Sequence, residues 1–92
     1  MPRYFFHVDN GKLIPDETGV EFPDQRTARR EAVYASATMI NALDPSFWEH
    51  RSPWNMHVTD EAGRLQFTLT FGHSVPSGEV LYRPAAIMRA EG

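Results

Sequence analysis

Apolar and polar residues alternate in several parts of the chain, and a helical repeat lies between those parts. Residues 3–9 are rich in aromatic and β-branched side chains, and residues 54–59 and 65–71 alternate apolar with polar positions. Alternation with a period of two is typical of strands that bury one face of an antiparallel sheet. Residues 25–43 instead repeat their apolar side chains every three or four positions, which predicts a helix.

The predicted helix has clear start and stop signals. Asp24 follows Pro23, and its short carboxylate can accept hydrogen bonds from the free N–H groups of the first turn. Asp44 precedes Pro45, and a residue before proline is disfavoured in helical geometry, so the helix should end there. The stripe expected to pack on the sheet is made mostly of small apolar residues: Ala28, Ala32, Ala35, Met39, Ala42 and Leu43.

A second apolar strip follows another side of the same helix. Either other parts of the chain cover this strip, or it forms a subunit contact, because exposed apolar patches tend to mark interfaces. The apolar residues near the C-terminus are one group that could dock on it. The candidate interface residues are therefore Val33, Ala37, Ile40, Val80, Leu81 and Tyr82.

The first hairpin is predicted around Asn10-Gly11, a dipeptide that favours tight turns because both of its positions tolerate positive φ. A two-residue turn pairs Val8 with Leu13. Leu13 then lies on the buried face, and Ile14 lies on the opposite face, across from His7.

The second hairpin, residues 54–71, has its apolar residues at even positions in the first strand and at odd positions in the second. Only a loop with an even number of residues places both sets on one face, so we expect a loop of residues 62–63 or of residues 61–64. Both loops give the same pairs: Val58 with Phe67, Met56 with Leu69, and Trp54 with Phe71. In the preceding loop, we expect Phe47 or Trp48 to fold over the core.

The order hairpin, helix, hairpin predicts an α+β domain of ββαββ type, an antiparallel sheet with one helix packed on one face. Residues 1–72 would form this single domain, and residues 73–92 a tail that either docks or is disordered. The core expected under the helix stripe contains Tyr4, Phe6, Val8, Leu13, Phe22, Met56, Val58, Leu65, Phe67 and Leu69.

The other face of the predicted sheet is mostly polar. It would carry Phe5, His7, Asn55, His57, Thr59, Gln66, Thr68 and Thr70. An aromatic side chain on an open sheet can stack on bases. The candidate residues for such binding are Arg3, Phe5, His7 and His57.

Several segments of the sequence resemble a family of short, uncharacterised proteins from rhizobia and related alphaproteobacteria that share a domain of unknown function. The segments are MPRYFFH at residues 1–7, PDETGVEFPD at residues 15–24, Ala28 with Glu31-Ala32, and VTDE at residues 58–61 with Gly63-Arg64. The resemblance covers about residues 1–71. It implies a small α+β domain and no known activity, cofactor or functional residue.

A looser likeness concerns shape alone. A strand hairpin followed by an Asp-x-x-Gly turn and an alanine-rich helix, residues 16–32, is similar in outline to antitoxins of the HicB type. Those proteins use a partly opened fold, like that of double-stranded-RNA-binding domains, to cover a toxin. This likeness implies a partner-binding protein.

Composition and motifs offer no catalytic chemistry. The chain has no cysteine, its four histidines lack metal-ligand spacing, and its two Asp-Glu pairs lie in predicted turns, where Asp is selected for backbone hydrogen bonds. A net charge of −3 disfavours nucleic acid as the main partner, and no apolar run is long enough to span a membrane. We therefore expect no catalytic, cofactor or metal site in a soluble cytoplasmic protein.

Two classes of function remain open. The first is a non-enzymatic interaction or regulatory module that binds itself, for example as a homodimer, or another protein in the manner of an antitoxin. The alternative is a weak binder of single-stranded nucleic acid that uses the open sheet face.

Overall fold

A computed structural model describes residues 1–50 and 52–83 of the 92-residue chain. Its helices and strands are β1 (Arg3–Asp9), β2 (Leu13–Ile14), β3 (Val20–Glu21), α1 (Gln25–Asn41), the 3₁₀ helix η1 (Pro45–Glu49), β4 (Trp54–Thr59) and β5 (Leu65–Phe71). The protein is an open antiparallel sheet with one helix, so the predicted α+β class and the order of hairpin, helix and hairpin are confirmed.

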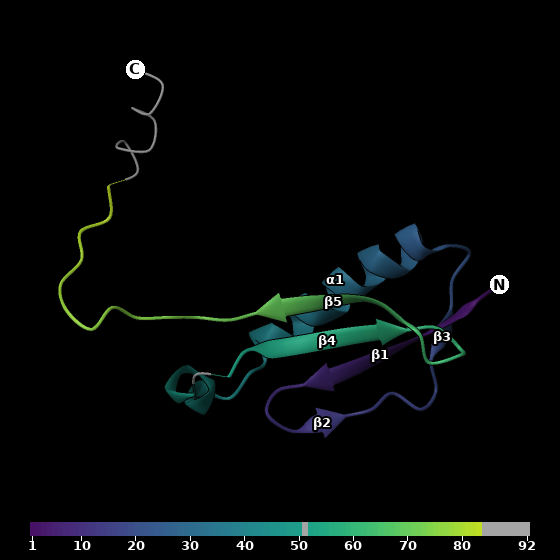
Figure 1. Ribbon diagram of the computed structural model, residues 1–92, viewed down its shortest axis with the longest axis horizontal. Helices are drawn as coiled ribbons and strands as arrows, with labels where there is room; N and C mark the ends of the chain where they lie inside the picture. Colours follow the sequence, from purple (N-terminus) through teal and green to yellow (C-terminus); the bar gives the residue numbers. More distant parts are fainter. Residues whose placement is uncertain (51, 84–92) are drawn as a thin grey trace, which may run out of the picture.

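The sheet has the strand order β2-β1-β4-β5, and β3 also pairs with β1 (Figure 1). β1 therefore lies inside the sheet, where it pairs with β4 from Phe5↔Thr59 to Asp9↔Asn55. β2 and β3 pair with opposite ends of β1 along its other edge. The helix runs behind the sheet and past the outer edge of β5 (Figure 1).

The helix begins where the sequence predicts. Asp24 has an extended backbone, and its carboxylate accepts a hydrogen bond of 2.8 Å from the N–H of Thr27. The helix ends at Asn41, two residues earlier than expected. The N–H of Leu43 bonds to the carbonyl of Ile40, which tightens the last turn, and Asp44 then caps η1 through the N–H of Ser46.

The buried line of the helix differs from the predicted stripe after its first two turns. Ala28 and Ala32 are fully buried, but the next buried residue is Ser36, whose hydroxyl lies 3.5 Å from the sulfur of Met56. The line thus follows every fourth residue, a row that is inclined to the helix axis. Met39 falls off this line and is 42% exposed, so its predicted place in the core is wrong.

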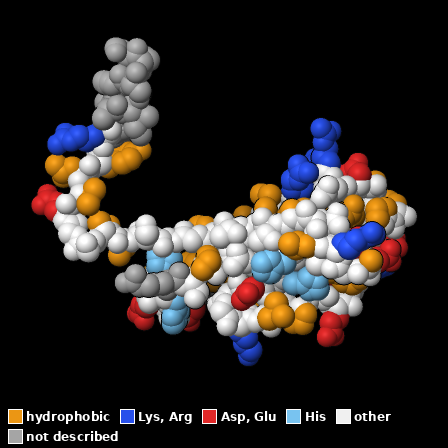
Figure 2. All heavy atoms as spheres, in the orientation of Figure 1, with side chains coloured by type: hydrophobic (Ala, Val, Ile, Leu, Met, Phe, Trp, Pro, Cys, Tyr) orange, Lys and Arg blue, Asp and Glu red, His pale blue; other side chains and the backbone are white. Residues whose placement is uncertain are grey.

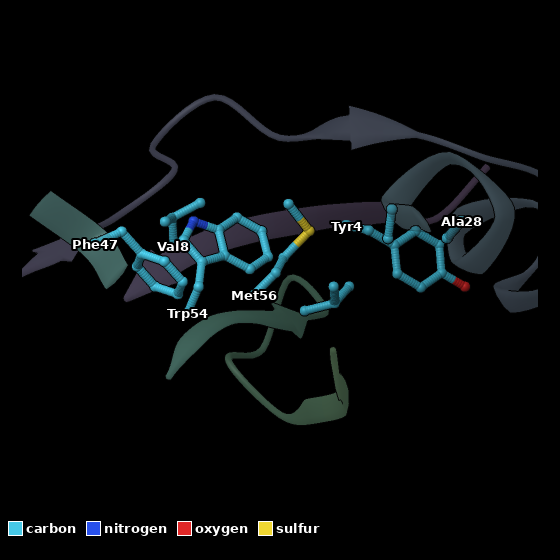
Figure 3. Packing of buried hydrophobic residues seen from close by; sticks show 8 residues of the cluster. Tyr4, Val8, Ala28, Phe47, Trp54 and Met56 are labelled. Carbon is cyan, nitrogen blue, oxygen red and sulfur yellow. The ribbon is translucent and has the colours of Figure 1, made fainter. Parts of the chain in front are cut away.

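The core gathers around β4. Trp54, Met56 and Val58 are almost completely buried, and Tyr4 and Val8 of β1 are buried with them. In Figure 3, the rings of Phe47 and Trp54 lie together at one end of this cluster. The expectation that Phe47 or Trp48 covers the core is confirmed for Phe47, whereas Trp48 is exposed.

The first hairpin has a different register from the one predicted. Val8 pairs with Ile14 and Asp9 pairs with Leu13, so the turn has three residues and Leu13 lies on the outer face, where it is exposed. A two-residue type I′ turn needs positive φ at both central positions, and here Gly11 has it (φ 99°) but Asn10 does not. The carboxylate of Asp9 instead accepts from the N–H of Gly11.

The second hairpin has the three predicted pairs, Val58↔Phe67, Met56↔Leu69 and Trp54↔Phe71. Its loop is nevertheless odd, because Thr59 pairs with Leu65 and residues 60–64 lie between them. A β-bulge at this point inserts one extra residue and restores the register of the later pairs. Leu65 therefore leaves the core face and is 60% exposed, which contradicts its predicted burial.

The chain after Gly72 forms no helix or strand up to residue 83 and extends away from the sheet (Figure 1). Its apolar residues, Val75, Val80, Leu81 and Tyr82, are all exposed. The part of the predicted tail at residues 84–92 lies outside the described residues.

Candidate interaction surfaces

The open face of the sheet brings the predicted aromatic and histidine residues together. His7 lies directly across from His57, and Phe5 lies across from Thr59. The rings of Phe5 and His7 are nearly parallel, with centroids 6.4 Å apart. Figure 2 shows histidine side chains together near the middle of this face.

Both nitrogens of His7 are used inside the protein. The N–H of Asp16 donates to Nδ1 at 3.1 Å, so Nδ1 carries no proton and Nε2–H is the donor to the hydroxyl of Thr59, also at 3.1 Å. His57 is engaged through Nδ1, which lies 2.9 Å from the hydroxyl of Thr68. His7 is therefore a structural residue that ties the loop after β2 to the centre of the sheet.

Asp16 is the centre of this loop. One carboxylate oxygen accepts from the N–H of Phe6 in β1 at 3.0 Å, and the other accepts from the N–H groups of Thr18 and Gly19. The side chain thereby occupies the gap between β2 and β3 and satisfies a strand N–H that has no strand beside it. Sequence reasoning treated Asp16 as an ordinary turn residue and missed this role.

The hydrogen bonds set the charge state of Asp16. Partial burial raises the pKa of its carboxyl, but the N–H groups of Phe6, Gly19 and Thr18 outweigh burial, and nearby His7 adds a smaller effect in the same direction. The pKa is therefore lowered from its ordinary value of 3.8. Asp16 is a charged structural group and not a general acid for reactions at neutral pH.

Gly19 and Arg3 close the same loop over the open face. Gly19 is buried with φ of 72°, and a Cβ atom there would lie 2.8 Å from the ring of Phe5. The guanidinium of Arg3 donates to the carbonyl of Thr18 at 2.9 Å and lies 3.4 Å from the carboxylate of Glu21. Two of the four candidate residues for base stacking, Arg3 and Phe5, are thus held against the protein's own loop.

The three candidate interface residues of the helix form one wall of an apolar groove. Val33, Ala37 and Ile40 lie on this wall, and Leu69 and Phe71 of β5 lie on the other. The groove has a volume of about 280 Å³, and Val33 remains 53% exposed. The sequence predicted the helical wall but not the strand wall, because the strand order was not readable from it.

The groove borders a free sheet edge. Within residues 1–50 and 52–83, β5 pairs with β4 alone, so the backbone N–H and C=O groups on its outer side have no strand partner. Such an edge can pair with another extended chain. The tail candidates Val80, Leu81 and Tyr82 do not lie in the groove.

A second cavity, of about 390 Å³, lies where the tail leaves the domain, between η1 and residues 73–75. The Nε2 atom of His73 lies 2.9 Å from the carbonyl of His50 and 3.2 Å from that of Phe47, and its ring packs 4.9 Å from that of Trp48. These contacts fasten the start of the tail to η1. They were missed because His73 is isolated in sequence.

Across the described parts of the chain, no three His, Asp or Glu side chains come together as metal ligands. None of the helices described there is long and apolar enough to cross a membrane.

Comparison with known sequences identifies the family. The chain belongs to the family described as Domain of unknown function (DUF6894), whose model matches residues 3–72. The predicted resemblance to a family of unknown function is thereby confirmed, and the match ends where β5 gives way to the tail. Neither the curated proteins nor the solved structures searched gave a match.

Proposed function

We propose that this protein is a non-enzymatic interaction module that associates with a second copy of itself through the groove between α1 and β5. The observation that carries the proposal is the position of an apolar groove directly beside a strand edge that no other described strand pairs with. A groove supplies apolar area, and an edge supplies backbone hydrogen bonds, which together make a common mode of protein recognition.

The burial of neighbouring strands supports this assignment. Trp54, Met56 and Val58 of β4 are 0–2% exposed, whereas Leu69 and Phe71, on the same face of β5, are only partly buried. The core is therefore complete under β4 and incomplete beside β5. Further apolar burial there would contribute roughly 25 cal/mol for each Å² removed from water.

The open face supports nucleic-acid binding less well. Stacking on bases needs an accessible ring and free cationic groups. Phe5 lies under Gly19, and Arg3 is bound to Thr18 and Glu21. An antitoxin-like complex would use the same groove but with another protein as its occupant.

The solution mass of the full chain tests the proposal. We expect the wild type to show a multiple of its 10.5 kDa chain mass by size-exclusion chromatography with light scattering, and Val33→Asp with Ile40→Asp to show the chain mass alone. A charge buried in the groove would lack a partner, which makes association costly. Tyr34→Asp is the matched control, because Tyr34 is exposed and does not line the groove.

Two outcomes contradict the proposal. One is a wild type that remains monomeric at millimolar concentration, and the other is a folded double variant that associates as the wild type does. If the double variant does not fold, Val33→Asp alone replaces it, because Val33 is half exposed and its substitution leaves the core intact.

A further inference from the structure

We propose that residues 79–83 of a second copy are the occupant of the groove, where they add a strand to the free edge of β5. This inference rests on the proposed self-association and identifies the segment that performs it. The sequence of the segment, EVLYR, has three consecutive apolar residues, one of them β-branched and one aromatic, a composition favoured in strands. Val80, Leu81 and Tyr82 are 63–81% exposed, so this segment of strand-favouring composition is not covered by the described part of its own chain.

The part of α1 that lies past the outer edge of β5 leaves room for a further strand beside β5. α1 runs behind the sheet, and part of it lies past β5 (Figure 1). Val33, Ala37 and Ile40 of α1 line the groove beside β5, so they would face the helix side of a strand added to that edge. Successive side chains of a strand point to opposite faces. A strand formed by residues 79–83 would therefore direct either Leu81 or the pair Val80 and Tyr82 toward the helix, and its backbone would pair with β5.

In the structure, this segment does not lie in the groove of its own chain. His73 is held to η1 through the carbonyls of Phe47 and His50, so the tail starts beyond the end of β5 and leads away from it. The sequence allows a turn at Pro76-Ser77-Gly78. A hairpin with that turn would pair residue 79 with residue 75 and residue 83 with residue 71, and would leave Leu69 uncovered.

A second copy has no such restriction. Residues 74–83, when extended, span about 33 Å. That length exceeds the 21 Å thickness of the molecule along its shortest axis. The tail of one copy can therefore reach a groove on a neighbouring copy, and the exchange can be reciprocal, as it is in symmetric dimers.

The first experiment alters the tail in the full chain. We expect Leu81→Asp with Tyr82→Asp, which places a charge on both faces of the segment, to reduce the solution mass twofold, from dimer to monomer. These residues are exposed, so the fold should be unaffected. Ser77→Asp is the matched control, because it places a charge in the tail outside the segment.

The second experiment identifies the contact. The chain has no cysteine, so one cysteine introduced into each of two variants can form a disulfide only between the two chosen positions or between two copies of the same variant. Thr70 lies on β5 beside the groove, and its side chain points to the open face, where its hydroxyl donates to Asn55. Leu81 and Tyr82 would point to opposite faces of the added strand, so we expect Thr70→Cys mixed with one of Leu81→Cys and Tyr82→Cys to give mainly the mixed disulfide between two copies on oxidation. Ala62→Cys, in the exposed turn after β4, replaces Thr70→Cys in the control and should give little mixed product.

The outcomes separate this inference from the function on which it rests. A monomeric wild type contradicts both the tail as the occupant and the proposed self-association. The tail is overturned as the occupant if the wild type is dimeric and its tail variant is also dimeric. It is likewise overturned if Leu81→Cys and Tyr82→Cys both link to Ala62→Cys as readily as to Thr70→Cys. Self-association through the groove would then stand, with the helix face of the second copy as the contact.

Discussion

The two edges of the sheet are finished in different ways. Along β1, two short strands pair with the backbone, and the carboxylate of Asp16 accepts from the N–H of Phe6 between them. Gly19 allows the connecting loop to lie on the ring of Phe5. Along β5, the described part of the chain supplies no strand, and an apolar groove follows the edge. Long unpaired edges promote association, so a protein that limits one edge to two-residue strands and leaves a seven-residue strand at the other favours association on one side.

The comparison also shows what a side chain can do in place of a strand. Between β2 and β3 the chain turns away from β1, and one carboxylate accepts the strand N–H that would otherwise be unpaired. Asp60 serves a similar purpose in the second hairpin, where its carboxylate accepts from the N–H groups of Ala62 and Arg64. Asp16 and Asp60 both lie in segments that resemble the family, so these segments have a structural role: their carboxylates accept hydrogen bonds from backbone N–H groups.

Gly19→Ala should break the closed edge most severely. Its φ of 72° disfavours a Cβ atom, and that atom would lie 2.8 Å from the ring of Phe5. We expect the free energy of unfolding to fall by about 2–4 kcal/mol, from left-handed strain and overpacking together. Urea denaturation followed by tryptophan fluorescence would measure it.

Gly63→Ala is the matched control for this change. Gly63 has φ of 82°, but its Cβ atom would have no neighbour within 4 Å. We expect a loss of only about 1–2 kcal/mol, from backbone strain alone. Equal losses for the two variants would show that the contact with Phe5 has no energetic importance.

Asp16→Ala should weaken the same edge by a smaller amount. It removes the acceptor of three backbone N–H groups, which belong to Phe6, Thr18 and Gly19. Hydrogen bonds to charged groups contribute about 1.5–3 kcal/mol, and we expect a loss in that range. Amide hydrogen exchange at Phe6 should also become faster, while exchange in β5 should not change.

The pH dependence of that loss has a definite sign. The pKa of Asp16 is lowered in the folded protein, so the folded state favours the charged carboxylate. Its contribution is complete at neutral pH, decreases as the pH falls below about 4, and is lost once the folded-state pKa is passed. The difference in unfolding free energy between wild type and Asp16→Ala should shrink accordingly from pH 7 to pH 2. A constant difference would contradict the charge-based account.

Leu65→Thr should have the smallest effect, and it tests the open edge. The bulge places Leu65 on the outer face with 60% exposure, so we expect the unfolding free energy to change by no more than about 0.5 kcal/mol. Had Leu65 been buried as its position in the alternation predicts, the loss would be about 1.5–3 kcal/mol. Urea midpoints of the two proteins distinguish these values.

Strict alternation and helix signals made much of the fold predictable. The pairs of β4 with β5, the cap at Asp24 and the polar outer face all follow from local patterns. The errors at Leu13 and Leu65 arose from turns, because one residue more or less in a loop moves a strand residue to the other face. Counting residues cannot reveal a bulge or a side-chain cap.

The candidate surfaces were less predictable than the fold. The helical wall of the groove could be read from Val33, Ala37 and Ile40, because helical periodicity is local. The strand wall depends on which strand lies at the edge, and Asp16 depends on a gap between β2 and β3. Both are properties of long-range pairing, which a single sequence does not encode in any short pattern.

The interior position of β1 has a consequence for biosynthesis. β1 is synthesised before β4, with which it pairs, and the bond between His7 and Thr59 spans 52 residues of chain. The side of β1 that faces β4 therefore stays unpaired until residue 59 has left the exit tunnel. Ala28 and Ala32 are likewise not fully buried until the sheet has formed. Within residues 1–50 and 52–83, no smaller unit has a complete core, so the domain folds as a whole after β4 has emerged.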